Sequence, residues 1–525
     1  MSSPTPLGVL HSAVINGVRS TLVTVEVHRD DGIPIETIVG LPGKAVRESL
    51  DRIRSACRRT DVYLEPRRTT VNLAPADHPK GGSGLDLPIA LGILVADGVV
   101  PGDRFRGSVC LGELQLDGSV QPVAGVLPAA LAARDAGFER LIVPRANAAE
   151  AAAVDELETI PIATLREAIE WAAGGATPAL DPPPVAAPVS PAIDLNEITG
   201  HLVARRALEI AAAGGHHLLM VGLPGSGKTM LAQALPGILP ALSRDEALEV
   251  SAIYSAVGKL GHHGLLQQRP FRAPHHSVTG IGLIGGGVPP RPGEVTLAHC
   301  GVLFLDEFPE FRRTALECLR QPLEEATVSL VRGGHHAELP ARFQLIAAMN
   351  PCPCGQGAES DKCRCTVGQV RGYWRRLSSP LLDRIDIVIA VEPVPLGELI
   401  ETTPRSESSK EVRQRVTEAR GCQQRRWQRL ATKEQGTVVT VNAALPTKLL
   451  SQVCRLSAAQ RRRARDEAER LEVSARGWHR VLRVARTIAD LAGREELHYV
   501  DLAEAFQYRQ RGQEMNAPAA RFTVA

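Results

Sequence analysis

The sequence predicts an α/β protein of several domains, and three observations carry this prediction. The chain has 525 residues, which is more than one hydrophobic core usually supports, so we expect two to four domains. Buried-type apolar runs alternate with helical patterns, which predicts a parallel sheet covered by helices. A stretch rich in Pro, Ala and Gly over residues 174–194 predicts an extended linker behind an N-terminal domain.

Residues 1–173 are predicted to form a compact α+β domain. The β-branched, alternating segment Thr21–Arg29 is typical of a strand, and residues 43–59 have apolar side chains at helical spacing. The apolar segment Leu85–Gly98 predicts a buried helix. Asp117 and Gly118 predict the turn of a hairpin, and a second helix and a short buried strand are expected after it.

Residues 195–404 have the pattern of a nucleotide-binding core. The segment HHLLMVGLPGSGKTMLAQAL predicts a strand, a glycine-rich loop and a helix. Two further apolar runs, GVLFLDEF and RFQLIAAMN, predict buried strands that end in polar residues. From residue 405 to 525 the pattern is helical and basic, with 24 Lys and Arg against 14 Asp and Glu. This imbalance favours a polyanionic partner such as nucleic acid, or else a solvated arginine-rich face.

The most informative motif is GLPGSGKT, which fits the phosphate-binding loop pattern in full. Its glycines let backbone N–H groups surround phosphates, and the helix that follows adds positive potential. We expect Lys228 to reach the β- and γ-phosphates and the Thr229 hydroxyl to bind Mg²⁺. The nucleotide-contacting residues are expected to be Gly222, Leu223, Pro224, Gly225, Ser226, Gly227, Lys228 and Thr229.

A second motif places two carboxylates at the end of the apolar run GVLFL. Asp306 is expected to hold the Mg²⁺ shell, and Glu307 to polarise the attacking water. Asn350 ends the next predicted strand, where an amide can orient that water. Arg384, in the segment LSSPLLDRID, is the candidate cation for the transferring phosphoryl group, unless it forms a surface pair with Asp383.

Four of the ten cysteines lie on one short segment, 352–365. Cys352, Cys354, Cys363 and Cys365 form two C-x-C pairs separated by eight residues. Four thiolates can close around Zn²⁺ in a structural tetrahedron, although the usual pairs have two to four residues between the cysteines. Reduced thiols and a redox pair remain as alternatives.

The rest of the sequence excludes other protein classes. No run of about 18 apolar residues exists, so no membrane span is expected. The N-terminus lacks the basic and apolar regions of a secretion signal, and ten cysteines in a chain of this length are not a disulfide scaffold. We therefore expect a cytoplasmic protein.

Taken together, these motifs resemble the magnesium-chelatase-like AAA+ ATPases, and within them the ComM/YifB group. The resemblance rests on GLPGSGKT, FRAPHHSVTGIGLIGGG, GVLFLDEFPEF, AAMNPCPCG and SSPLLDRID, and it covers nearly the whole chain. It implies an AAA+ core with insertions, a helical lid, ATP and Mg²⁺ as cofactors, and a ring that is expected to be a hexamer. ComM is a DNA branch-migration motor of natural transformation.

The resemblance also assigns roles to individual residues. Arg384 matches the arginine finger of the family, and Arg476 matches the sensor-2 arginine, with Arg480 as its competitor. FRAPHHSVTG matches an insertion, and SLVRGGHHAELPARF matches a hairpin; such loops point into the ring pore. The hairpin residues that are expected to touch DNA phosphates are Arg332, His335 and His336, unless they only flank a tight glycine turn.

The N-terminal domain resembles the domain that Lon proteases share with ribosomal protein S5. Leu127 stands where Lon has its catalytic lysine, and Ser83 lies one or two places from the position of the nucleophile. A Ser–Lys dyad needs an amine to accept the serine proton, so no peptidase activity is expected.

The sequence therefore predicts an ATP-driven motor on single-stranded or branched DNA, acting in branch migration or unwinding. The main alternative is a protein remodeller of the kind of the chelatase motor subunit. A Lon-like protease and an ATP-gated regulator are further alternatives.

Overall fold

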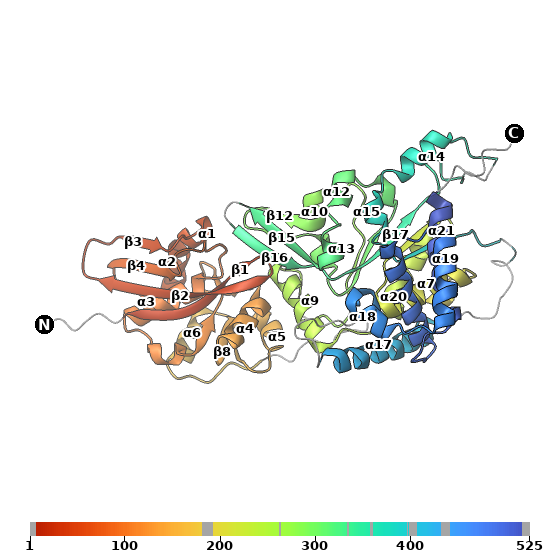
Figure 1. Ribbon diagram of the computed structural model, residues 1–525. Helices are drawn as coiled ribbons and strands as arrows, with labels where there is room; N and C mark the ends of the chain where they lie inside the picture. Colours follow the sequence, from red (N-terminus) through yellow and green to blue (C-terminus); the bar gives the residue numbers. More distant parts are fainter. Residues whose placement is uncertain are drawn as a thin grey trace.

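The structure is a computed structural model. It describes residues 7–180, 193–261, 264–332, 335–357, 361–395, 397, 407–431 and 441–516. Figure 1 shows an elongated molecule in which the N-terminal sheet, the central sheet and the C-terminal helices follow one another. Most of the predicted linker, residues 181–192, lies outside the described part. Within that part, no helix combines the length and apolar composition that crossing a bilayer requires.

The N-terminal part is built on a seven-stranded mixed sheet in the order β3-β4-β2-β1-β5-β8-β9. Its strands are β1 Gly8–Asn16, β2 Arg19–Asp30, β3 Glu36–Val39, β4 Arg68–Ala74, β5 Ser108–Cys110, β8 Arg140–Pro144 and β9 Glu158–Ile162. The two-stranded hairpin of β6 Glu113–Leu114 and β7 Val120–Gln121 confirms the turn predicted at Asp117 and Gly118. The alternating burial of β2 confirms the strand predicted there.

Helices cover this sheet, and those in the segments 43–59, 85–98 and after the hairpin confirm the predicted ones. They are α1 Lys44–Arg47, α2 Ser49–Arg59, α3 Asp86–Ala96, α4 Val126–Asp135, α5 Ala148–Ala151 and α6 Leu165–Ala172. Every residue of α3 is buried, because its segment has hardly any polar side chains and packs on β1 and β2.

The central sheet has five parallel strands in the order β11-β14-β17-β10-β18. These strands are β10 Leu218–Gly222, β11 Phe271–Arg272, β14 Val302–Leu305, β17 Gln344–Met349 and β18 Ile387–Val391. All residues of β10, β14 and β17 are buried, which explains their unbroken apolar sequence. The predicted parallel-sheet core is therefore confirmed.

The helices of the central part are α7 Leu202–Gly214, α8 Lys228–Ile238, α9 Arg244–Ala256, α10 Gly280–Ile284, α11 Glu294–Leu297, α12 Arg313–Glu317, α13 Pro322–Glu325, α14 Val367–Trp374 and α15 Ser379–Leu382. Two short antiparallel pairs accompany them: β12 Gly285–Gly286 with β13 Arg291–Pro292, and β15 Thr327–Arg332 with β16 His335–Pro340. The β15–β16 pair confirms the predicted hairpin.

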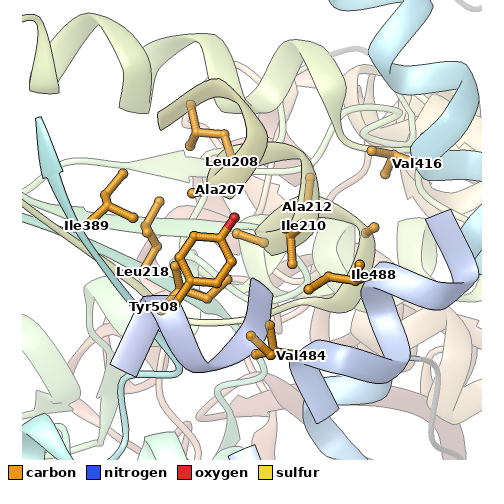
Figure 2. Packing of buried hydrophobic residues seen from close by; sticks show 14 of the residues in the cluster. Ala207, Leu208, Ile210, Ala212, Leu218, Ile389, Val416, Val484, Ile488 and Tyr508 are labelled. Carbon is orange, nitrogen blue, oxygen red and sulfur yellow. The ribbon is translucent and has the colours of Figure 1, made fainter. Parts of the chain in front are cut away.

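The C-terminal region is helical, as predicted, with α17 Ser409–Ala431, α18 Thr447–Val453, α19 Ala458–Arg470, α20 Ala475–Leu491 and α21 Tyr499–Asn516. The Ser474 side chain caps α20 by accepting from Gly477 N. Figure 2 shows how this region joins the central sheet in one apolar cluster: α7 and α21 pack on the sheet, and α17 and α20 pack on α7. The labelled residues are Ala207, Leu208, Ile210, Ala212, Leu218, Ile389, Val416, Val484, Ile488 and Tyr508.

The N-terminal part packs directly on the central part through α4 and α9. The backbone N–H of Gly125 donates to the carbonyl of Ser255 at 2.9 Å, and the N–H of Leu127 lies 3.3 Å from the Ser255 hydroxyl. Leu127 is fully buried there, in one apolar cluster with Ala252 of α9. Leu127, which the resemblance to Lon sets at the lysine position, is thus part of an internal contact.

Candidate functional site: a nucleotide pocket at the edge of the parallel sheet

The predicted phosphate loop connects β10 to α8. Gly225 and Gly227 have φ angles of 75° and 83°, in the left-handed region that favours glycine. Gly222 has no room for a side chain, because a Cβ there would lie 2.3 Å from the Val391 carbonyl oxygen. The loop therefore curls at the N-terminus of α8, whose free N–H groups and dipole favour an anion.

Lys228 lies at the start of α8 and is 8% exposed. Its Nζ lies 2.9 Å from the carbonyl oxygen of Gly222, 2.7 Å from that of Leu223 and 3.5 Å from Asn350 Oδ1. Burial lowers the pKa of Lys228, and the nearby Asp306 charge opposes that shift. The ammonium group is thus held inside the loop, at the pocket wall, where its positive charge favours an anion.

Thr229 and Asp306 are brought together from different elements. The Thr229 hydroxyl at the start of α8 donates to Asp306 Oδ2 at 2.7 Å, and Asp306 follows β14 directly. The backbone N–H of Glu307 donates to Asp306 Oδ1 at 2.9 Å. A hydroxyl beside a carboxylate in this position is the arrangement that holds Mg²⁺ in phosphate-loop ATPases.

Glu307 and Asn350 complete the same pocket. Glu307 has a left-handed φ of 51°, which turns the chain sharply after β14. Asn350 follows β17, the strand between β10 and β14, so the carboxyl ends of all three strands meet at one edge. The pocket has a volume of about 680 Å³, and its lining includes Lys228, Thr229 and Asp306 together with Glu307 and Asn350.

His276 is a pocket residue that the sequence analysis missed. The insertion that contains it was expected to face a ring pore, yet Ala273 to His276 line the nucleotide pocket. The His276 Nδ1 atom lies 3.0 Å from Glu307 Oε2. The stretch follows β11, which pairs with β14, and this neighbouring position brings it to Glu307. The only sequence signal was the histidine pair in FRAPHHSVTG, and nothing in that motif indicates that it lies near Glu307.

Comparisons with known proteins bear on this pocket and on the whole chain. Three family models match in chain order: Subunit ChlI of Mg-chelatase over residues 25–147, Magnesium chelatase, subunit ChlI over 194–399, and Magnesium chelatase, subunit ChlI C-terminal over 406–509. Competence protein ComM of Haemophilus influenzae is 42% identical over 509 residues, which cover 96% of this chain and 97% of ComM. This chain belongs to the magnesium-chelatase-like ComM/YifB family.

A second full-length relative agrees with this membership, and a more distant one matches part of the chain. The uncharacterized protein YifB of Salmonella typhimurium is 40% identical over 506 residues, which cover 96% of this chain and 97% of YifB. DNA helicase MCM8 of Xenopus tropicalis is 26% identical over 215 residues, which cover 38% of this chain and 22% of that protein. As an AAA+ family, the ComM/YifB group implies ATP and Mg²⁺ as cofactors, and the pocket residues described above fit both.

The arginine finger candidate of this ComM/YifB protein lies outside its own pocket. Arg384 follows α15, is 13% exposed at its side chain and forms an ion pair with Glu324. Its Nη1 donates to the Pro380 carbonyl at 2.6 Å. It is absent from the described residues that line the pocket, so a role in hydrolysis requires the pocket of a neighbouring copy.

The two sensor-2 candidates differ in their surroundings. Arg476 is exposed in the first turn of α20. Arg480, one turn later, has its Nη1 atom 2.7 Å from Oδ1 of the buried Asp386. Neither lines the pocket among the described residues. Since the Asp386 contact already engages Arg480, Arg476 is the better candidate, and its role stays a prediction.

Replacing Asp386 with Asn is expected to destabilise the protein by about 3 kcal/mol, because it leaves Arg480 unpaired in a mostly buried site. Burial alone would raise the pKa of Asp386, but Arg480 and His216 outweigh it and hold that pKa well below its ordinary range. The carboxylate's stabilisation is therefore complete at neutral pH and is lost only as the pH falls below about 4. Urea unfolding at pH 7 measures the effect.

The control for this variant is Asp466→Asn, which changes an exposed carboxylate of α19. It should alter the free energy of unfolding by less than about 0.5 kcal/mol. Unchanged stability in Asp386→Asn would mean that Arg480 is not needed there and is free to serve the nucleotide.

The hairpin residues predicted to touch DNA lie at the tip of β15 and β16. Arg332 and His336 are exposed, and the backbone of Arg332 pairs with that of His335. The side chain of His335 lies outside the described part. The base of the hairpin packs on the N-terminal part, since a Cβ on Gly17 would lie 3.0 Å from Leu339.

The four predicted zinc ligands are also brought together. Ligand atoms of Cys352, Cys354, Cys363 and Cys365 all lie within 4.8 Å of one another. Ser83, in contrast, hydrogen-bonds to Glu113 in the N-terminal part.

Proposed function

We propose that this protein is a cytoplasmic AAA+ ATPase that assembles as a ring, expected to be a hexamer, and moves on single-stranded or branched DNA. In this proposal it drives branch migration or strand unwinding during recombination or natural transformation. The observation that carries its chemistry is the pocket in which Lys228, the Thr229–Asp306 pair and Glu307 converge. The DNA substrate is supported by the match to ComM, which is named a competence protein, over 97% of that protein's length.

The proposed roles follow from the positions of the side chains. Backbone amides of the phosphate loop and Lys228 bind the triphosphate, and Thr229 with Asp306 holds Mg²⁺. Glu307 polarises water, and Asn350, from the adjacent strand, orients it. His276 is a positioning residue: its contact with Glu307 restrains the carboxylate until the geometry of the pocket changes.

Positive charge on the surface supports a polyanionic substrate along which the protein moves. The described C-terminal region includes the exposed, arginine-rich helix α19, and the β15–β16 hairpin adds Arg332. Cations of this kind bind phosphates without reading the base sequence, and their contribution falls steeply with salt. The N-terminal part, related in the proposal to the Lon and S5 folds, then serves binding or assembly.

One experiment separates the motor from its main alternative. ATP turnover is measured with no addition, with four-way DNA junctions, and with single strands, in wild type and in Lys228→Ala. Stimulation by DNA together with strand exchange that Lys228→Ala loses supports the proposal. Turnover that ignores DNA would overturn it and favour a protein remodeller.

Replacing Arg332 with Ala is expected to lower DNA stimulation of turnover, because the hairpin loses a phosphate contact. The slope of log affinity against log salt should fall by about one per contact removed. Fluorescence anisotropy of a labelled single strand at several salt concentrations measures it. The control is Arg106→Ala, an exposed arginine of the N-terminal part. Equal salt slopes in both variants would exclude the hairpin from the DNA path.

A further inference from the structure

Four thiols gather beside the nucleotide pocket, just beyond Asn350. The Sγ atom of Cys352 lies 3.4 Å from that of Cys354 and 3.8 Å from that of Cys363. The Cys354 and Cys363 sulfurs are 3.6 Å apart, and Cys365 completes a group within 4.8 Å. Two of these residues follow β17 and the pocket residue Asn350, and the other two precede α14, so the group joins the end of β17 to α14.

These separations fit a single metal ion. Thiolates bound to tetrahedral Zn²⁺ at about 2.3 Å lie about 3.8 Å from one another. A disulfide would bring two sulfurs to about 2.05 Å. Clusters of several irons need thiolates that are farther apart. The arrangement is therefore that of a closed mononuclear site with four sulfur ligands.

A second group of possible metal ligands is less suited to bind an ion. Ligand atoms of Glu249, His299 and Cys300 also lie within 4.8 Å of one another. There, however, the Arg342 guanidinium lies 3.0 Å from the Cys300 sulfur and 3.4 Å from Glu249 Oε2. A side-chain cation already balances that group. The four-cysteine group reaches the surface at Cys354, which is exposed, so an ion can enter there.

The backbone around the cysteines supports a metal-bound thiolate. The N–H of Gly357 donates to the Cys352 sulfur at 3.3 Å, the kind of outer contact that orients metal ligands. Gly355 and Gly357 both have φ angles of 82°, which allow the tight turn between the cysteine pairs. A Cβ on Gly355 would lie 2.8 Å from Pro224 Cγ, so this turn packs on the phosphate loop.

The other side of the group is tied to α14. The indole N–H of Trp374 donates to the carbonyl of Pro351 at 3.1 Å, between Asn350 and the first cysteine. The turn after Asn350 thus contacts the phosphate loop through Gly355 and α14 through Pro351.

We propose that Cys352, Cys354, Cys363 and Cys365 bind one structural Zn²⁺, and that this ion clamps the turn after Asn350 against the phosphate loop. Four protein ligands leave no open position, so the ion positions the pocket and does not react. The metal site does not depend on the proposed function and is tested by metal content alone, whereas the clamp rests on the proposed nucleotide binding.

The first test is the metal content of the full-length protein, purified without chelators or added metal. Plasma mass spectrometry should find about one zinc per chain. The double variant Cys354→Ser/Cys363→Ser should lose it. The control Cys318→Ser, whose parent thiol bonds to the Thr314 carbonyl, should keep it. Less than about 0.2 zinc per chain in wild type, or stoichiometric iron in place of zinc, would overturn the assignment.

A second measurement needs no variant and so does not depend on variant folding. Wild-type protein exchanged with Co²⁺ should show thiolate-to-cobalt charge-transfer absorption in the near ultraviolet. Mass mapping after alkylation should find all four cysteines free once the metal is removed. A disulfide among them in freshly purified protein would contradict the metal site.

The clamp itself is tested by binding of a non-hydrolysable ATP analogue with Mg²⁺. If the metal preorders the turn that packs on Pro224, its loss adds an ordering cost, and the Kd should rise about tenfold in the double variant. Cys318→Ser is the control, and it should bind the analogue with the same Kd as wild type. Equal affinity in metal-free and metal-bound protein would overturn the clamp.

Discussion

Changing Glu307 to Gln is expected to lower ATP turnover by about 10³-fold while ATP binding is kept. The amide is nearly the same size as the carboxylate but cannot accept a proton from the attacking water, and general bases contribute about 10²–10⁴-fold to rates. Lys228, Thr229 and Asp306 are unaffected, so the triphosphate and Mg²⁺ remain bound. Steady-state phosphate release and equilibrium binding of labelled ATP measure the two quantities on the same preparation.

The matched control is Glu310→Gln, three residues further along the chain. Glu310 pairs with Arg376 at 2.7 Å and is not among the described residues that line the pocket. Its turnover should stay close to that of wild type. If Glu307→Gln loses ATP binding as well, the carboxylate is a ligand rather than a base. If it keeps full turnover, the base lies elsewhere.

Changing Arg384 to Ala is expected to lower turnover by about 10³-fold, because a finger arginine stabilises charge on the transferring phosphoryl group. The decisive measurement mixes two inactive proteins. Arg384→Ala has an intact pocket, and Lys228→Ala has an intact Arg384. Mixed rings should recover turnover, since one protein supplies the pocket and the other supplies the arginine.

The ion pair with Glu324 provides the control for this experiment. If Arg384 only stabilises the fold through that pair, Glu324→Gln should lower turnover as much as Arg384→Ala does, and mixing should recover nothing. If Arg384 acts in a neighbouring pocket, Glu324→Gln should keep most of the activity. Recovery in the mixture with full activity in Glu324→Gln is the expected pair of results.

The central sheet and the phosphate pocket could be predicted because their signals are local. The glycines of GLPGSGKT are required for the phosphate-binding shape of the loop. Buried parallel strands appear in the sequence as continuous apolar runs, which end directly before Asp306 and Asn350. The helices at the C-terminus followed from apolar spacing in the same way. The four cysteines were close in sequence, so their meeting in space was also accessible.

Contacts between distant segments could not be predicted. His276 reaches Glu307 only because β11 pairs with β14. Neither segment of the sequence indicates that these two strands are neighbours in the sheet. Arg480 was the competitor of Arg476 for the sensor-2 role, and its contact with the distant Asp386 could not be predicted from the sequence. Leu127 was recognised as a departure from a lysine position, but its packing on α9 depends on how two parts of the chain meet.

The bonds from Ser255 to the start of α4 have a mechanical consequence. In the chain, helix α9 stands between α8, which begins at Lys228, and the segment that leads to β11 and His276. Any rotation of α9 during turnover is transmitted to α4 and then to the N-terminal sheet. Because this contact ties the N-terminal part to α9, we expect the two to move together and not independently.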